Sequence, residues 1–162
     1  MNLYEKIFKS LNKEGIKYIV VGGVAVNLHG YMRFTGDLDL LVMLDDENLN
    51  KMDKLMQKMG YTERLPIPVL SLQNTHQVKK WLKEKNMKAY SFIPPKDNPL
   101  QIDIVIEESL KFEKIASKKI IKKIEDVSIP VVSIEDLIKM KKKSDRPQDI
   151  IDIKALNNLK TE

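Results

Sequence analysis

The chain has 162 residues, of which 43% are hydrophobic and 31% charged, a composition that fits one globular domain and excludes an intrinsically disordered chain. The absence of cysteine excludes disulfide bonds, thiolate metal sites and cysteine nucleophiles. No apolar segment approaches the roughly 20 residues of a transmembrane helix, and the first residues are not those of a signal peptide, so we expect a cytoplasmic protein with no membrane partner. We predict a single domain over residues 1–162, with a core over about 1–132 and a helical pair over about 133–160.

The net charge of +5 rests on 28 basic residues, of which 25 are lysines. Such a charge favours an anionic partner, for example a nucleotide or RNA. We nevertheless interpret most lysines as the solvated faces of amphipathic helices, because they are scattered along such segments. The only arginines are Arg33, Arg64 and Arg146, and each is notable because arginine and lysine are not interchangeable at a phosphate or carboxylate group.

Hydrophobic periodicity and the positions of glycine predict the elements in the first part of the chain. In chain order they are a helix over 3–14, a strand over 18–21, a short helix over 24–29, a strand over 37–43 and a helix over 46–59. A glycine directly follows each of these helices, as expected for a C-terminal cap.

The middle of the chain is less regular, because Pro66 and Pro68 interrupt any continuous element. Beyond them we predict, in chain order, a helix over 75–88 and strands over 89–93 and 100–106.

The last part of the chain is predicted to contain a hairpin followed by two helices. The hairpin pairs residues 118–124 with 128–132 around Glu125-Asp126. Ser133 begins a capping box that opens a helix to about residue 143, and the last helix starts near Pro147. The predicted fold class is therefore α/β (α+β), a mixed sheet flanked by helices with two C-terminal helices.

The segment Asp37-Leu38-Asp39-Leu40 opens the second predicted strand. Side chains alternate across a strand, so Asp37 and Asp39 share one face, about 7 Å apart, and the leucines share the other. Two such carboxylates can reach one hard cation or a pair of cations, and without a cation their like charges raise each other's pKa. Taken alone, the pair is more often an exposed strand end than a metal site.

Gly22-Gly23 lies where the first predicted strand turns into the short helix. Glycine lets the backbone approach a ligand closely, and a helix N-terminus presents N–H groups and a positive dipole end to phosphate. Taken alone, such a pair is often only a tight turn.

Asp103 interrupts an apolar strand, where Ile102, Ile104 and Ile106 share the opposite face. An ionised aspartate at this position needs a metal or another partner, and a salt bridge to a lysine is the alternative. We expect the carboxyl groups of Asp37, Asp39 and Asp103 to converge within reach of one cation, beside the turn at 22–23.

These features in this order resemble the nucleotidyltransferase superfamily of DNA polymerase beta and the antibiotic nucleotidyltransferases. The shared pattern is an apolar residue and two small residues, then Asp-apolar-Asp-apolar, then an Asp in a later strand. The chain is more closely similar to small prokaryotic members such as the nucleotidyltransferase toxins of abortive-infection systems. Their pattern resembles Gly22-Gly23-Val24-Ala25, Gly30 and the segment from Arg33 to Asp39, and later Ser133 to Leu137, Lys141, Arg146, Asp149 and Asp152.

The resemblance implies a metal-dependent enzyme that transfers a nucleoside monophosphate from a nucleoside triphosphate to a hydroxyl of RNA, a protein or a small molecule. It implies that Asp37, Asp39 and Asp103 are the catalytic residues and bind two Mg²⁺ ions, with Mn²⁺ as an alternative. Asp103 also helps to deprotonate the attacking hydroxyl.

The resemblance further implies a set of residues that bind the nucleotide. Gly22 and Gly23 hold the β- and γ-phosphates. Arg33 and Lys141 are counter-charges for phosphate, and Thr35 forms a hydrogen bond near the metal-binding strand.

A second hypothesis is a catalytically silent relative that binds a nucleotide or a partner protein, for instance as one half of a toxin–antitoxin pair. The presence of all three carboxylates favours the hypothesis of an active enzyme. A basic nucleic-acid-binding module is the weakest hypothesis, since the chain lacks aromatic interleaving and any such motif. Either a second copy of the chain or a partner protein is a candidate for completing the site.

Several other residues are predicted to be structural. Arg146, Asp149 and Asp152 are interpreted as a stabilising set of ion pairs on the last helix. His29 and His76 have no partner at metal-ligand spacing, and Trp81 is interpreted as a core contact, with base stacking as the alternative.

Overall fold

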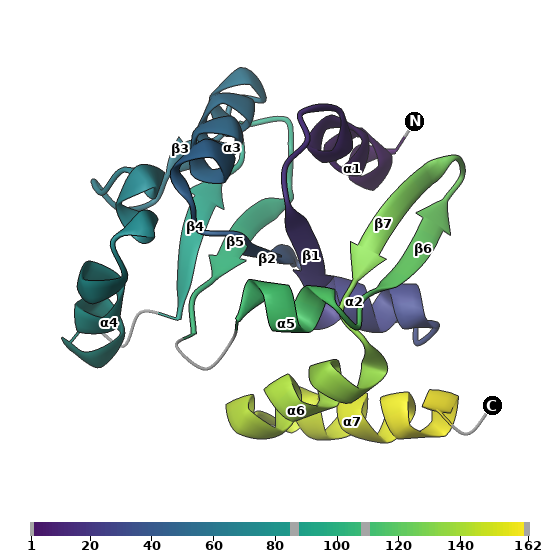
Figure 1. Ribbon diagram of the computed structural model, residues 1–162. Helices are drawn as coiled ribbons and strands as arrows, with labels where there is room; N and C mark the ends of the chain where they lie inside the picture. The colour runs from purple at the N-terminus through teal and green to yellow at the C-terminus, as the bar shows by residue number, and fades with distance from the viewer. Residues whose placement is uncertain (1, 85–87, 108–110, 161–162) are drawn as a thin grey trace.

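The computed structural model describes residues 2–84, 88–107 and 111–160, and within them a single mixed sheet organises the chain (Figure 1). The strand order is β3-β4-β5-β2-β1-β7-β6. The strands are β1 (Tyr18–Val21), β2 (Asp37–Val42), β3 (Thr62–Glu63), β4 (Ala89–Ile93), β5 (Gln101–Val105), β6 (Ile120–Ile124) and β7 (Val127–Val131).

Helices lie above and below this sheet in the view of Figure 1. They are α1 (Leu3–Lys13), α2 (Gly22–His29), α3 (Asp46–Lys58), α4 (Thr75–Glu84), α5 (Phe112–Ala116), α6 (Ile134–Ser144) and α7 (Pro147–Lys160), with a 3₁₀ turn η1 (Val69–Gln73). α1 and α3 lie at the top of the view and α5, α6 and α7 at the bottom, where α6 and α7 pack against each other and against α2. The α/β architecture with two C-terminal helices is therefore as predicted.

The helix boundaries follow from capping residues and apolar faces. The Asn2 side chain caps α1, Asp45 caps α3 and Ser133 caps α6, each accepting a hydrogen bond from a backbone N–H three residues later. Of the predicted helix over 75–88, residues 75–84 are helical, and positions 85–87 lie outside the described residues. The predicted hairpin turns at Glu125-Asp126, where Glu125 adopts φ 53°.

Three elements were not predicted: β3, η1 and α5. Each has five residues or fewer. Such short segments show too little periodicity to be recognised, and tertiary pairing decides their conformation.

The register of the central strands brings the predicted acidic positions together. β1 runs antiparallel to β2 and pairs Val21 with Asp39, and β5 runs parallel to β2 and pairs Asp103 with Asp39. The intervening residues Leu38, Leu40, Ile102 and Ile104 are fully buried in the core. Because side chains alternate across a sheet, the aspartates lie on the opposite face.

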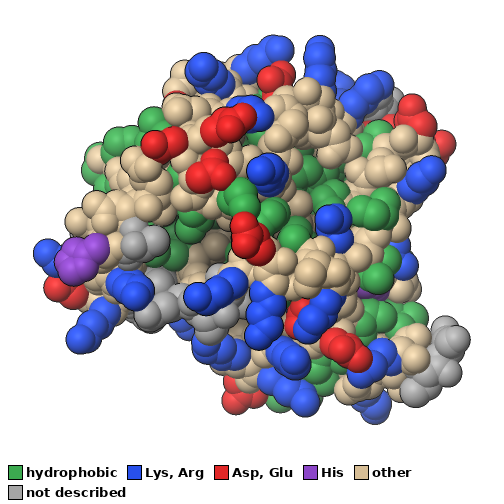
Figure 2. Space-filling model, in the orientation of Figure 1, with side chains coloured by type: hydrophobic (Ala, Val, Ile, Leu, Met, Phe, Trp, Pro, Cys, Tyr) green, Lys and Arg blue, Asp and Glu red, His purple; other side chains and the backbone are tan. Residues whose placement is uncertain are grey.

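Surface charge agrees with the interpretation of the lysines as solvated. Figure 2 shows lysine and arginine side chains spread over the visible face and most dense in its lower part, over the C-terminal helices of Figure 1. None of the helices in the described part of the chain has the length and apolarity needed to span a bilayer.

Candidate active site

The carboxylate site, which we define as Asp37, Asp39 and Asp103, spans two adjacent strands. Asp37 is the exposed first residue of β2 and Asp39 is partly buried, whereas Asp103 on β5 is 8% exposed. Asp39 and Asp103 are direct register partners in neighbouring strands, which lie about 4.8 Å apart. The sheet therefore brings together three acidic residues that are distant in sequence.

The carboxylate site carries uncompensated negative charge. Burial and, after it, the nearby charges of Asp103 and Asp37 raise the pKa of Asp39 to about 7, although Arg146 and Lys141 act in the opposite direction. The pKa of Asp37 is also raised, first by burial and then by Asp103, with Arg64 acting in the opposite direction. A group of carboxylates that resists full ionisation is chemically suited to a hard divalent cation.

The expected convergence of the three carboxyl groups on one cation is not met by the side-chain positions seen here. Within residues 2–84, 88–107 and 111–160, no three Asp, Glu, His or Cys side chains are arranged to hold one ion. Asp103 Oδ1 instead accepts a hydrogen bond of 2.8 Å from Gln101 Nε2, and the Asp39 carboxylate lies against Gly22. Such separation reduces the repulsion between the like charges.

The turn that follows β1 requires glycine at both of its positions. Gly22 has φ +67°, and a Cβ there would lie 2.2 Å from Asp39 Oδ2. A Cβ on Gly23 would lie 2.6 Å from Thr35 Oγ1. α2 begins at Gly22 without a side-chain cap, so its first-turn N–H groups point from the helix end beside Asp39. This combination is suitable for binding the phosphates of an anionic ligand.

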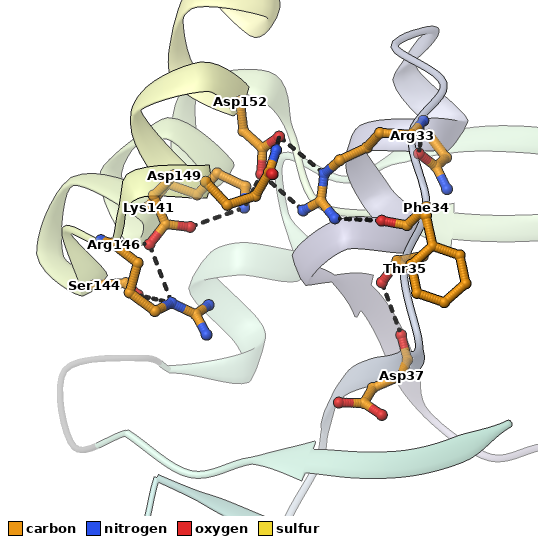
Figure 3. A network of polar contacts seen from close by, with 11 residues as sticks. Arg33, Phe34, Thr35, Asp37, Lys141, Ser144, Arg146, Asp149 and Asp152 are labelled. Carbon is orange, nitrogen blue, oxygen red and sulfur yellow. Dashed lines mark hydrogen bonds and ion pairs between the residues drawn. The ribbon is translucent and has the colours of Figure 1, made fainter.

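Arg33 and Thr35 lie on the segment that leads from α2 into β2 (Figure 3). Arg33 binds Asp152 of α7 through two hydrogen bonds, from Nε at 2.9 Å and from Nη2 at 2.8 Å. Arg33 Nη1 also donates to the carbonyl oxygen of Phe34, and Thr35 Oγ1 makes a long contact of 3.4 Å with the carbonyl oxygen of Asp37. The segment that positions Asp37 is thereby attached to α7.

Lys141 lies in the same group of contacts, almost completely buried. Its Nζ lies 2.8 Å from Asp152 Oδ2 and 3.2 Å from Asp149 Oδ1. Arg146 donates to Asp149 through its backbone N–H at 2.9 Å and through Nε at 3.3 Å. We call Arg33, Lys141, Arg146, Asp149 and Asp152 the ion-pair network.

Of the predicted set, the ion pair between Arg146 and Asp149 is confirmed. Asp152 instead pairs with Arg33 and Lys141, two residues predicted to bind phosphate. The charges of Arg33 and Lys141 are each matched by Asp152 in this structure. Lys141 and Arg146 nevertheless act on the pKa of Asp39, so the ion-pair network borders the carboxylate site.

The remaining candidates take structural positions. His29 Nε2 lies 2.7 Å from the carbonyl oxygen of Val132, and burial lowers the pKa of its ring. Trp81 is 9% exposed and belongs to the hydrophobic core, as predicted. His76 is exposed on α4.

Sequence reasoning did not identify Gln101 and Arg64 as residues of this site. Gln101 is the register partner of Asp37 and donates to Asp103, and Arg64 Nη2 donates to Gln101 Oε1 at 2.9 Å. A signal for Gln101 was present, because it precedes Asp103 by two positions in a strand and must share its face.

Comparison with known proteins assigns the chain to a family. The family profile described as "Nucleotidyl transferase AbiEii toxin, Type IV TA system" matches residues 7–162. A search of curated protein sequences finds no match.

Three solved structures share the fold at low sequence identity. The lincomycin-bound lincosamide antibiotic adenylyltransferase LnuA is 17% identical with a TM-score of 0.65, over 96% of this chain and 95% of that chain. The antibiotic-resistance factor ANT(2'')-Ia is 13% identical with a TM-score of 0.61, over 98% and 81% of the two chains. The protein TM1012 from Thermotoga maritima is 14% identical with a TM-score of 0.60, over 96% and 91% of the two chains. With the profile covering nearly all of its length, the chain belongs to the AbiEii family of nucleotidyltransferase toxins.

Proposed function

We propose that this chain is a metal-dependent nucleotidyltransferase that transfers a nucleoside monophosphate from a nucleoside triphosphate to a hydroxyl of an acceptor. The observation that carries the proposal is the pairing of Asp39 with Asp103 across β2 and β5, directly beside the uncapped N-terminus of α2. Carboxylates for cations and backbone N–H groups for phosphate are thus adjacent on one face.

The carboxylate site has the donor chemistry for Mg²⁺, and Mn²⁺ is a suitable substitute. Asp37, Asp39 and Asp103 offer hard oxygen ligands. Burial first and neighbouring carboxylate charge second raise the pKa values of Asp37 and Asp39, and a bound cation would balance that charge. When bound, two such ions would neutralise phosphate charge and activate a hydroxyl for attack on phosphorus.

Each residue of the site has a separate role in the proposed transfer. The first-turn N–H groups at Gly22 and Gly23 hold the β- and γ-phosphates. Asp103 accepts the proton of the attacking hydroxyl, whose oxygen forms the new bond to the α-phosphorus while the bond to the bridging oxygen breaks and pyrophosphate leaves. Arg33 and Lys141 stabilise the phosphates from the border of the site, where Thr35 holds the start of β2.

Labelling of acceptors tests this proposal. The protein is incubated with the four α-³²P-labelled nucleoside triphosphates, Mg²⁺ or Mn²⁺, and bulk RNA or cell extract. We expect label in an acceptor, and a loss of more than about 100-fold in Asp37→Asn and Asp39→Asn, because these changes remove metal ligands. Asp126→Asn, on the exposed turn between β6 and β7, is the matched control and should label normally.

A catalytically silent module that binds a nucleotide or a partner protein is the second candidate. The observation that favours it is the hydrogen bond that Asp103 Oδ1 already accepts from Gln101 Nε2. Such a module would bind nucleoside triphosphate and label nothing, and Asp39→Asn would then behave like wild type in the labelling assay. The family description adds a type IV toxin–antitoxin context, and we propose that the chain acts in the cytoplasm as the toxin component.

A further inference from the structure

A row of residues crosses the sheet on the face of the carboxylate site. Val21, just before Gly22, pairs with Asp39, Asp39 pairs with Asp103, and Asp103 pairs with Ser91 of β4. The backbone N–H of Arg64, directly after β3, donates to the Ser91 carbonyl oxygen at 3.1 Å. Gly22 and Arg64 therefore lie at opposite ends of this row, with the carboxylates between them.

The side chain of Arg64 lies on the same face as the carboxylates. Its neighbour Glu63 pairs with Phe92, which is buried in the core, so alternation directs Arg64 to the other face. The hydrogen bond from Arg64 Nη2 to Gln101 confirms this direction. Arg64 also lowers the pKa of Asp37, which shows that its charge acts on the carboxylate site.

Arg64 differs from the other two arginines of the chain. Arg33 and Arg146 are held by carboxylates of α7, whereas the described hydrogen bond of the exposed Arg64 side chain is to a neutral amide. That bond uses one of the five N–H donors of a guanidinium group. A planar guanidinium is well suited to a phosphate group, which it can bind through two parallel hydrogen bonds.

The geometry of in-line displacement at phosphorus determines which substrate lies on the Arg64 side of the carboxylate site. The leaving pyrophosphate would be held at Gly22 and Gly23, beyond Asp39 in the row. The attacking hydroxyl must enter opposite the leaving group, and therefore from the side of β5, β4 and Arg64. The backbone of Arg64 lies roughly 10 Å along the row from that of Asp103, at two strand spacings. Its guanidinium reaches back toward Asp103 and is separated from that carboxylate by the side chain of Gln101, a position suited to a group attached to the acceptor rather than to the reacting atoms.

We propose that Arg64 binds a phosphate group of the acceptor, close to the hydroxyl that attacks. This inference rests on the proposed function, since it needs the donor phosphates to occupy the turn at Gly22. The phosphate belongs either to the end of a nucleic acid strand or to a small phosphorylated alcohol. The Gln101 amide accepts a hydrogen bond from the Arg64 guanidinium and donates one to Asp103. It therefore links the proposed acceptor-binding position with the carboxylate that receives the proton.

Equilibrium binding with separate probes for the two ends of the row tests the inference. Tripolyphosphate with Mg²⁺ probes the donor side. Glycerol 3-phosphate and a short single-stranded RNA with a free 3′-hydroxyl probe the acceptor side, and the same RNA with neutral methylphosphonate linkages is the charge control. The variants are Arg64→Gln, Arg64→Lys and Gln101→Ala, with Lys123→Gln on the exposed part of β6 as the matched loss of one positive charge.

We expect Arg64→Gln to weaken binding of at least one acceptor probe by about tenfold, as for loss of a charged hydrogen bond, and to leave tripolyphosphate binding within about twofold. Arg64→Lys should restore part of the affinity, Lys123→Gln should have little effect, and the neutral RNA should bind all variants alike. The probe that loses affinity identifies the source of the phosphate.

Three results would overturn the inference. The first is equal binding of both acceptor probes to wild type and Arg64→Gln, including no binding to either. The second is an equal loss of tripolyphosphate binding in Arg64→Gln. The third is a larger loss of acceptor binding in Gln101→Ala than in Arg64→Gln, which would show that the amide and not the guanidinium binds the phosphate. Failure of tripolyphosphate to bind wild type in the presence of Mg²⁺ would instead contradict the proposed function.

Discussion

Two groups of aspartates are joined by the short segment that leads into β2, and the pKa values of Asp39 in one and Asp149 in the other shift in opposite directions. In the carboxylate site, burial and like charges raise the pKa of Asp39 to about 7. In the ion-pair network, burial also raises the pKa of Asp149, but the backbone N–H of Arg146 and the side chains of Ser144 and Lys141 outweigh it and hold the pKa at about 2. Burial acts on both groups, so the difference comes from their partners.

The contrast separates the proposed binding site from a set of ion pairs that stabilises the fold. The ion-pair network contains its own cations, and it stabilises the attachment of α7 and α6 to the segment before β2. The carboxylate site lacks enough positive charge of its own and is in this sense incomplete without a ligand. Stability measurements can test this distinction without knowledge of the acceptor.

The largest effect should come from removing the central anion of the ion-pair network. Asp152 is fully buried and binds both Arg33 and Lys141. Asp152→Asn keeps the volume of the side chain but leaves two cations short of a partner, so we expect the free energy of unfolding in urea to fall by about 3–5 kcal/mol. Glu47→Gln, which breaks an exposed pair with Lys51, is the control and should cost less than about 0.5 kcal/mol. A change below about 1 kcal/mol in Asp152→Asn would show that the network does not stabilise the fold.

The next effect is a loss of stability in acid that depends on Asp149. A carboxylate with a folded pKa near 2 and an ordinary value of 3.8 stabilises the fold above pH 4, and this contribution is lost as the pH falls from about 4 to 2. We expect about 2 kcal/mol from this group, measured as the difference in the pH dependence of urea unfolding between wild type and Asp149→Asn. Identical slopes for the two proteins below pH 4 would exclude the assignment.

The carboxylate site should show the opposite dependence and a smaller effect. The pKa of Asp39 is raised on folding, so its contribution to stability decreases as the pH rises from about 4 to 7, and it destabilises the fold at pH 8. In metal-free buffer at pH 8, Asp39→Asn should therefore be more stable than wild type by about 1–2 kcal/mol. Added Mg²⁺ should stabilise wild type and have less effect on the variant. A destabilised variant in metal-free buffer would mean that the site is already compensated by other groups.

The comparison also shows what sequence reasoning can reach. Apolar periodicity, glycines and capping residues were enough for the long helices and strands, and strand alternation placed Asp37 and Asp39 on one face. That Asp103 lies beside Asp39 depends on the non-local pairing of β2 with β5, for which the sequence offered only a family resemblance. The links from Arg33 to Asp152 and from Arg64 to Gln101 were not predicted, because their partners are set by packing across 119 and 37 positions of the chain. The metal-binding and phosphate-binding roles of the site residues stay predictions.

The smallest effect concerns Arg64, a cation outside the ion-pair network that acts on the carboxylate site. Arg64 lowers the pKa of Asp37, against burial and the charge of Asp103, which raise it. Arg64→Gln should therefore raise the pKa of Asp37, measured from the side-chain carboxyl ¹³C shift of Asp37 during a pH titration in metal-free buffer. Gln101→Ala keeps the guanidinium charge and is the matched comparison, so it should shift the Asp37 pKa less than Arg64→Gln does. If both variants shift the pKa equally, the position of Arg64 depends on Gln101, and the carboxylate site receives its outside charge through that hydrogen bond. If neither variant shifts the pKa of Asp37, the charge of Arg64 does not act on that carboxylate.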